Sequence, residues 1–196
     1  MSSSEKSIFS SSVFSEITSP PSALNTKLGV RFALTGTLHS GAWEGSCRVG
    51  DLKDLTYESE RAHADKQLSL LKQELKSRTL PPEVVLIEPT SLYSLAQKAD
   101  PDIRLPAGQL ETLAERDEDT DVYVVTHPYE GVKIAERYRK PVIIMQEAGW
   151  AVDMPPAIRA MGLESFHAED LDTVFQFVRV LTAKKALKQT KLLYVT

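Results

Sequence analysis

The sequence has little cysteine and no long apolar run, and its charge is not basic; each shortage excludes a class of protein. Its 196 residues contain a single cysteine, Cys47, which rules out a disulfide framework and a cysteine-based zinc cluster. No apolar run approaches the ~20 residues that a helix needs to cross a bilayer. The net charge of -4 does not suit a nucleic-acid-binding surface, which needs clustered basic side chains. We therefore expect a protein that binds neither nucleic acid nor membrane.

The first 27 residues differ in composition from the rest of the chain. Ten of them are serine, and their few apolar side chains offer too little surface to offset the entropy lost on ordering. We expect residues 1–27 to form a disordered leader. Because Ile8, Phe9, Val13, Phe14 and Ile17 have some helical spacing, the alternative is a short amphipathic segment that docks on a partner. The start lacks the basic and apolar regions of a signal peptide, so we expect a cytoplasmic protein.

From residue 28 onward, apolar runs rich in Val, Ile and Leu alternate with segments of helical period. Most runs are continuous, which predicts strands that are covered on both faces. The expected strands span 29–35, 84–88, 122–126, 141–145, 163–167 and 192–196, and helices are expected over 54–76, 91–98, 107–116, 131–139 and 154–161. A last helix has the apolar stripe Leu171, Val174, Phe175, Val178 and Leu181. This order predicts one α/β domain over 28–196, a doubly wound, flavodoxin-like (Rossmann-like) three-layer sandwich with a mostly parallel sheet.

Polar and aromatic residues follow several of the expected strands. In a doubly wound domain the carboxyl ends of the strands meet at one edge, which is where ligands bind. We take five residues as candidates for the rim of a substrate site: His39, Thr126, His127, Tyr129 and Trp150. For each of them, an ordinary loop or packing role is the alternative. Glu88 and Glu147 also lie at strand ends, where carboxylates can do acid–base work but are more often solvated.

The sequence carries no motif for a nucleotide, a metal or a catalytic triad. The glycine-rich loop at 36–41 lacks the Gly-Lys-Ser/Thr of a phosphate-binding loop, and the chain has no GxGxxG. That loop does not run straight into a helix, which makes it a poor candidate for binding FMN. The four histidines show no paired metal-ligand spacing. We therefore assign no catalytic residue, no metal ligand and no cofactor to this chain.

The second half of the chain resembles the amino-terminal domain of the L-fucose and L-arabinose isomerase-like family. The resemblance rests on THPYEGVKIAERYRKPVIIM at 126–145 and on GWAVDMPPAIRAMGLESFHAEDLDTVFQFVRVLTAKKALKQTKLLYVT at 149–196. It implies two flavodoxin-like domains followed by a carboxyl-terminal domain. It also implies aldose–ketose isomerisation through an enediol with a divalent metal, usually manganese, whose ligands lie beyond residue 196. In such proteins the amino-terminal domain builds the oligomer and lends residues to a neighbouring subunit's site.

The resemblance therefore leads us to expect the amino-terminal domain of a sugar isomerase-like protein, not catalytic alone. Its partners would be a small-molecule sugar and further copies of itself. Because 192–196 reads as an apolar strand with no helix after it, we expect a longer parent protein; a natural end on an edge strand is the alternative. Two other functions stay open. One is a stand-alone flavodoxin-like module that binds a small polar ligand or a nucleotide, and the other is an assembly domain without a ligand.

Overall fold

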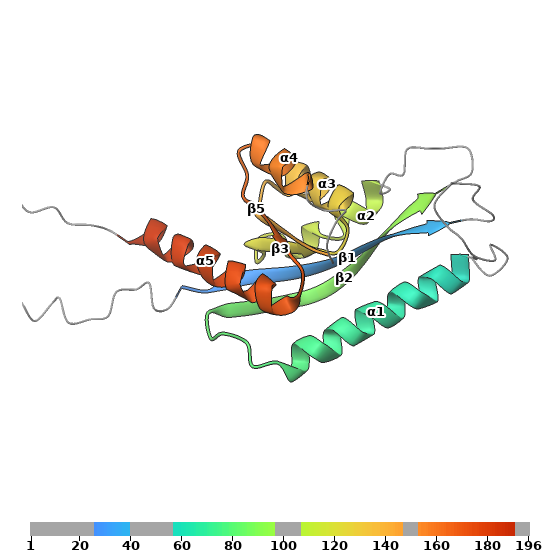
Figure 1. The fold of residues 1–196 in the computed structure, drawn as a ribbon, viewed down its shortest axis with the longest axis horizontal. Coiled ribbons are helices and arrows are strands. Elements are labelled where there is room, and N and C mark those ends of the chain that lie inside the picture. Colours follow the sequence, from blue (N-terminus) through green and yellow to red (C-terminus); the bar gives the residue numbers. More distant parts are fainter. Residues whose placement is uncertain (1–25, 40–56, 97–106, 147–152, 191–196) are drawn as a thin grey trace, which may run out of the picture.

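A computed structural model describes residues 26–39, 57–96, 107–146 and 153–190. They form a five-stranded, all-parallel sheet with the strand order β2-β1-β3-β4-β5 (Figure 1). The strands are β1 (Leu28–His39), β2 (Val84–Ala96), β3 (Val122–Val125), β4 (Val142–Met145) and β5 (Ser165–Ala168). This is the flavodoxin-like strand order, so the predicted doubly wound fold is confirmed. Residues 1–25 of the expected leader (1–27) and the expected strand at 192–196 lie outside the described residues.

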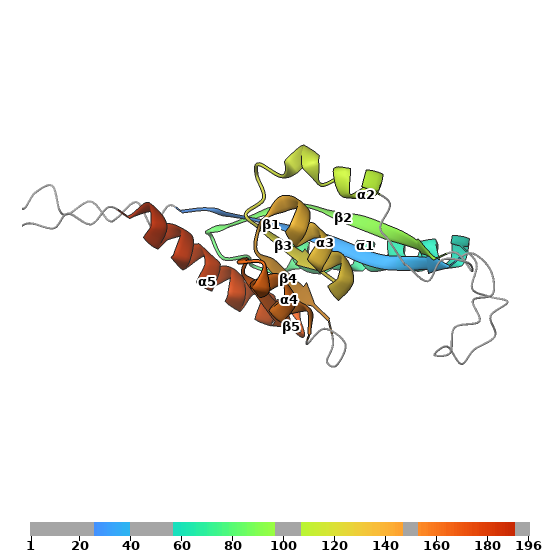
Figure 2. The same cartoon turned by 90° about the horizontal axis from the view of Figure 1, so that it is seen from above.

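Helices cover both faces of the sheet, as Figures 1 and 2 show. They are α1 (Tyr57–Ser77), α2 (Ala107–Glu111), α3 (Pro128–Tyr138), α4 (Met154–Ala160) and α5 (Leu171–Gln189), with the short 3-10 helix η3 (Ala114–Arg116) after α2. One core joins α1 and α5 to the sheet through side chains such as Leu75 and Val178. The other joins the α2–η3 segment, α3 and α4 to the opposite face through Leu113, Ile134 and Ile158 among others. Because both faces are buried, the strands read as continuous apolar runs in the sequence.

The expected helix at 91–98 is wrong, because that segment continues strand β2 as far as Ala96. Pro89 directly follows the expected strand at 84–88, and proline donates no hydrogen bond to a neighbouring strand. β2 lies at the edge of the sheet, where a proline is tolerated. The register also shifts at this point: Arg31 pairs with Ile87 but Ala33 pairs with Thr90, so Phe32 lies opposite two residues of β2. The resulting bulge accommodates Pro89 and lets the strand continue.

Two other expected helices differ at their ends. The segment expected as one helix over 107–116 is divided into α2 and η3. Helix α3 begins at Pro128, three residues before the expected start at 131, because proline suits the first helical turn. As a result, His127 is the N-cap of α3 rather than a residue of a long loop.

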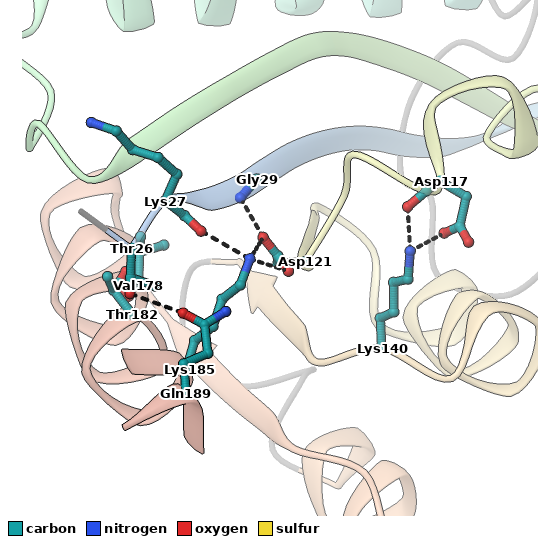
Figure 3. A network of polar contacts seen from close by, with 10 residues as sticks. All are labelled: Thr26, Lys27, Gly29, Asp117, Asp121, Lys140, Val178, Thr182, Lys185 and Gln189. Atoms are coloured by element: carbon teal, nitrogen blue, oxygen red, sulfur yellow. Dashed lines mark hydrogen bonds and ion pairs between the residues drawn. The ribbon is translucent and has the colours of Figure 1, made fainter. Parts of the chain in front are cut away.

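Hydrogen bonds to Asp121 join three elements at the amino edge of the sheet (Figure 3). Asp121 accepts a hydrogen bond from Gly29 N at 2.7 Å and from Lys185 Nζ at 2.8 and 2.7 Å. Lys185 also donates to the backbone oxygen of Lys27 at 2.9 Å. This one carboxylate therefore holds the start of β1 and the last turns of α5 against the start of β3.

We expect Asp121→Ala to lower the free energy of unfolding by about 2 kcal/mol, because charge-assisted hydrogen bonds are lost at a site that water partly screens. Asp119→Ala is the matched control, since its partner Arg116 and its own side chain are more than half exposed. The control should cost less than about 0.5 kcal/mol in urea unfolding. Equal losses in the two variants would contradict the role given to Asp121.

Tyr123 is a fully buried side chain on β3 whose hydroxyl donates to Asp117 Oδ1 at 2.8 Å. Burial raises the pKa of Tyr123 above its ordinary value of 10.0, and the hydrogen bond to Asp117 raises that pKa further. The folded state thus holds this proton more tightly than the unfolded state does. The stabilisation of the folded state is complete below pH 10 and is lost as the pH rises toward the raised folded pKa.

We expect the melting temperature of the wild type to fall above pH 10. In Tyr123→Phe, which has no hydroxyl to titrate, the melting temperature should fall less steeply with pH. Identical pH dependence of the melting temperature in the two proteins would contradict this role of Tyr123.

Candidate functional site

The carboxyl edge of the sheet is the candidate site because the strand order reverses there. β1 has β2 on one side and β3 on the other, which is the arrangement that opens a ligand crevice in doubly wound domains. β1 continues beyond Ala33, the last residue that pairs with β3. The described polar side chains at this edge are Thr35, Thr126, His127, Gln146 and His167.

Thr126, a predicted rim residue, braces β1 against the end of β3. Its Oγ1 accepts a hydrogen bond from Thr35 N at 2.9 Å and donates one to Thr35 O at 3.1 Å. These two side-chain hydrogen bonds continue the contact between β1 and β3 beyond the last backbone pair, Ala33 and Val125. Thr126 therefore shapes the edge, and its hydroxyl is already engaged with the backbone.

His127, the second predicted rim residue, is oriented by a buried carboxylate. It is the N-cap of α3, and Glu130 occupies the third helical position. His127 Nδ1 lies in close contact with Glu130 Oε2, with 34% of the His127 side chain exposed and only 1% of the Glu130 side chain. Glu130 is thus the group that orients the His127 ring.

Glu130 is a functional candidate that sequence reasoning missed. A buried carboxylate needs compensating partners, and the start of α3 supplies His127 and the positive end of the helix dipole. The signal was present as His-Pro-Tyr-Glu, since an acidic residue three positions after an N-cap is typical of a helix start. Recognising it required starting the helix at Pro128.

Two buried polar atoms flank the end of β3. Thr35 Oγ1 and Gln146 Oε1 are buried, and neither has a hydrogen-bond partner within the part of the chain that the structure describes. The alternation of side chains along β1 and β4 places both on the face that α3 covers, since they follow Ala33 and Ile144 of that core by two residues. Buried polar atoms are normally paired. These two therefore mark a place where water or a ligand supplies the missing hydrogen bonds.

His167 is also engaged with the backbone at this edge. Its Nε2 lies 2.9 Å from the backbone oxygen of Gln146, and Gln146 N donates to Ala168 O at 3.0 Å. These contacts fix the turn that presents Gln146.

The other predicted rim residues are only partly placed. His39 is the last residue of β1 and Tyr129 lies in the first turn of α3, but their side chains are outside the described part of the structure. Trp150, Glu147 and the glycine-rich loop beyond His39 lie outside the described residues. Glu88 is exposed and binds Lys72 at 2.5 Å, and the hydrogen bond from Lys72 lowers the pKa of this carboxyl. An exposed ion pair of this kind agrees with the solvated role of Glu88, which was the alternative to acid–base work.

Arg31 is a buried cation that the sequence pattern did not single out. Only 5% of it is exposed, and its guanidinium donates to Leu113 O at 2.8 Å, Thr112 O at 3.3 Å and Thr90 Oγ1 at 3.1 Å. Among the described residues no carboxylate forms an ion pair with it. The backbone oxygens that follow α2 carry partial negative charge and solvate it instead. Arg31 therefore fastens the α2–η3 segment to the sheet, away from the carboxyl edge.

Within the described ranges, no three His, Cys, Asp or Glu side chains come close enough together to hold a metal ion. The resemblance places the manganese ligands beyond residue 196, and the described residues supply no cluster that would replace them. No helix among them has the length and apolar character to cross a membrane. Comparisons of the chain with family models, curated proteins and solved structures find no match. The candidate site therefore stands on its own geometry.

Proposed function

We propose that this chain is a sugar-binding domain, equivalent to the amino-terminal domain of an L-fucose or L-arabinose isomerase-like protein, and that it holds the substrate without converting it. The observation that carries the proposal is the pair of buried atoms Thr35 Oγ1 and Gln146 Oε1, which have no hydrogen-bond partner among the described residues, at the carboxyl edge where His127 precedes α3. A sugar carries several hydroxyls, and each one donates one hydrogen bond and accepts others, so neighbouring hydroxyls can donate to Gln146 Oε1 and bond to the Thr35 hydroxyl and the His127 ring. The same resemblance leads us to propose that copies of the chain associate.

The roles of the site residues follow from their contacts. Thr126 keeps β1 and β3 in register, Glu130 orients the His127 ring, and His167 supports the turn that carries Gln146. His127, Gln146 and Thr35 are then the groups that meet the ligand. The proton transfer of an isomerisation needs a base aimed at a C–H bond, which we assign to parts of the parent protein outside this chain.

Nuclear magnetic resonance of the four histidine rings tests this proposal. We expect L-fucose or L-arabinose at millimolar concentration to shift the ring signals of His127. His63 is the internal control, because it is exposed on α1 with Gln67 as its neighbour at 3.5 Å. A shift of His63 equal to that of His127, or no shift of His127 with any aldose, would contradict sugar binding at this edge. A shift with FMN or a nucleotide but with no sugar would contradict it in favour of the stand-alone module.

A further inference from the structure

Gly131, in the first turn of α3, lies against the sheet at a point where a side chain would be crowded. The residue is buried, and a Cβ at this position would lie 3.0 Å from Val125 Cγ2. The same Cβ would lie 3.5 Å from Val142 Cγ1 and from Ile144 Cγ1. Carbon atoms in ordinary contact are ~3.5–4.0 Å apart, so only the contact with Val125 would be too short. The missing side chain therefore lets α3 pack directly on β3 and β4.

His127 is linked to Gly131 through both its backbone and its ring. Gly131 N donates to His127 O at 3.3 Å, which is the bond that the carbonyl of an N-cap accepts at the start of a helix. The His127 ring contacts Glu130, the residue directly before Gly131. On the other side of His127 the chain is fixed, because Thr126 Oγ1 exchanges two hydrogen bonds with the backbone of Thr35. A movement of α3 away from β3 would therefore be taken up at His127.

Such a movement would also change how far His127 lies from the other two proposed ligand groups. Thr35 belongs to β1 and Gln146 directly follows β4, so neither moves with α3. Both lie on the face of the sheet that α3 covers. We propose that Gly131 is a positioning residue of this site, because its lack of a side chain sets the distance from His127 to Thr35 and Gln146. This role rests on the proposed function, since it concerns the same ligand.

The ring signals of the histidines, measured by nuclear magnetic resonance without sugar, test this role. We expect Gly131→Ala to shift the signals of His127 and to leave those of His63 on α1 unchanged. For the aldose that the wild type binds, Gly131→Ala should raise the dissociation constant about fivefold, because hydrogen bonds weaken as their geometry leaves the optimum. Glu136→Ala, at an exposed position of the same helix, is the matched control and should change neither quantity.

Val125→Ala separates positioning from stability. It removes Cγ2, the atom that a Cβ at position 131 would approach most closely. In this background, Gly131→Ala should change neither the His127 signals nor the dissociation constant, because the crowding is gone. Val125→Ala itself should lower the melting temperature, since Val125 is fully buried. If Gly131 acted through stability alone, the less stable double variant would bind the aldose more weakly than Gly131→Ala does.

Two results would overturn the proposal. The first is unchanged His127 ring signals in Gly131→Ala, with the variant shown to be folded by circular dichroism. The second is an effect of Gly131→Ala that is equally large in the Val125→Ala background. Neither result would contradict sugar binding by the wild type. A wild type that binds no aldose would contradict the proposed function, and the ring signals without sugar would still report whether Gly131 positions His127.

Discussion

Replacing Gly29 by alanine is expected to lower the free energy of unfolding by about 3 kcal/mol or more. A Cβ at position 29 would lie 1.8 Å from the backbone oxygen of Asp119 and 2.9 Å from its carbonyl carbon. Backbone atoms cannot rotate away as a flexible side chain can, so β1 and the loop before β3 must separate. That movement also strains the hydrogen bonds that Gly29 exchanges with Asp121, from Gly29 N to Oδ2 at 2.7 Å and from Asp121 N to Gly29 O at 2.8 Å.

Gly162→Ala is the matched control for this change. Gly162 has a φ of +77°, and a Cβ there meets no atom within 4 Å. Its substitution should cost only the strain of a left-handed backbone, on the order of 1 kcal/mol. Urea unfolding of both variants measures the difference. A loss at Gly29 that does not exceed the loss at Gly162 would mean that β1 approaches the loop less closely than described.

Phe175→Ala is expected to cost about 3–5 kcal/mol, the usual loss when a buried phenylalanine is truncated. Phe175 is 8% exposed and packs with Val174 and Val178 of α5 against the sheet. The loss combines the lost transfer of the ring from water with the cavity that remains. The free energy of unfolding in urea, compared with the wild type, is the measurement.

Gln176→Ala, at the neighbouring exposed position of the same helix, controls for changes in helix propensity. It should change stability by less than about 0.5 kcal/mol. A loss below roughly 1 kcal/mol for Phe175→Ala would show that α5 lies at the periphery of the core. The assignment of α5 to one face of the sheet would then be wrong.

The sequence supports the fold more strongly than it supports the site. The stripe from Leu171 to Leu181 and the apolar runs of β1, β3 and β4 follow from burial on both sides of a parallel sheet, which leaves a direct trace in hydrophobic periodicity. The continuation of β2 past Pro89 depends on strand order, because proline is tolerated only where the strand has a free edge. The hydrophobic periodicity of the sequence does not indicate the order of the strands in the sheet.

The candidate site also contains residues that the local sequence predicts and residues whose roles depend on packing. Thr126 and His127 were found because they directly follow a strand, which is a property of the local sequence. The roles of Glu130 and Gln146 depend on how deeply each is buried and on what lies beside it in space. Arg31 stands out in the sequence only as one charge in an apolar run, and its two backbone acceptors are 81 and 82 residues away. Contacts of this kind arise from packing and leave no short-range pattern.

Calorimetric titration of the chain with the aldose that shifts His127 tests the central claim most directly, by comparing the wild type with His127→Ala and His63→Ala. If His127 meets the ligand at the carboxyl edge, His127→Ala should raise the dissociation constant at least tenfold, a loss of about 1.4 kcal/mol. His63→Ala should leave the dissociation constant unchanged. An unchanged dissociation constant in His127→Ala, with the variant folded, would contradict sugar binding at this edge of the sheet.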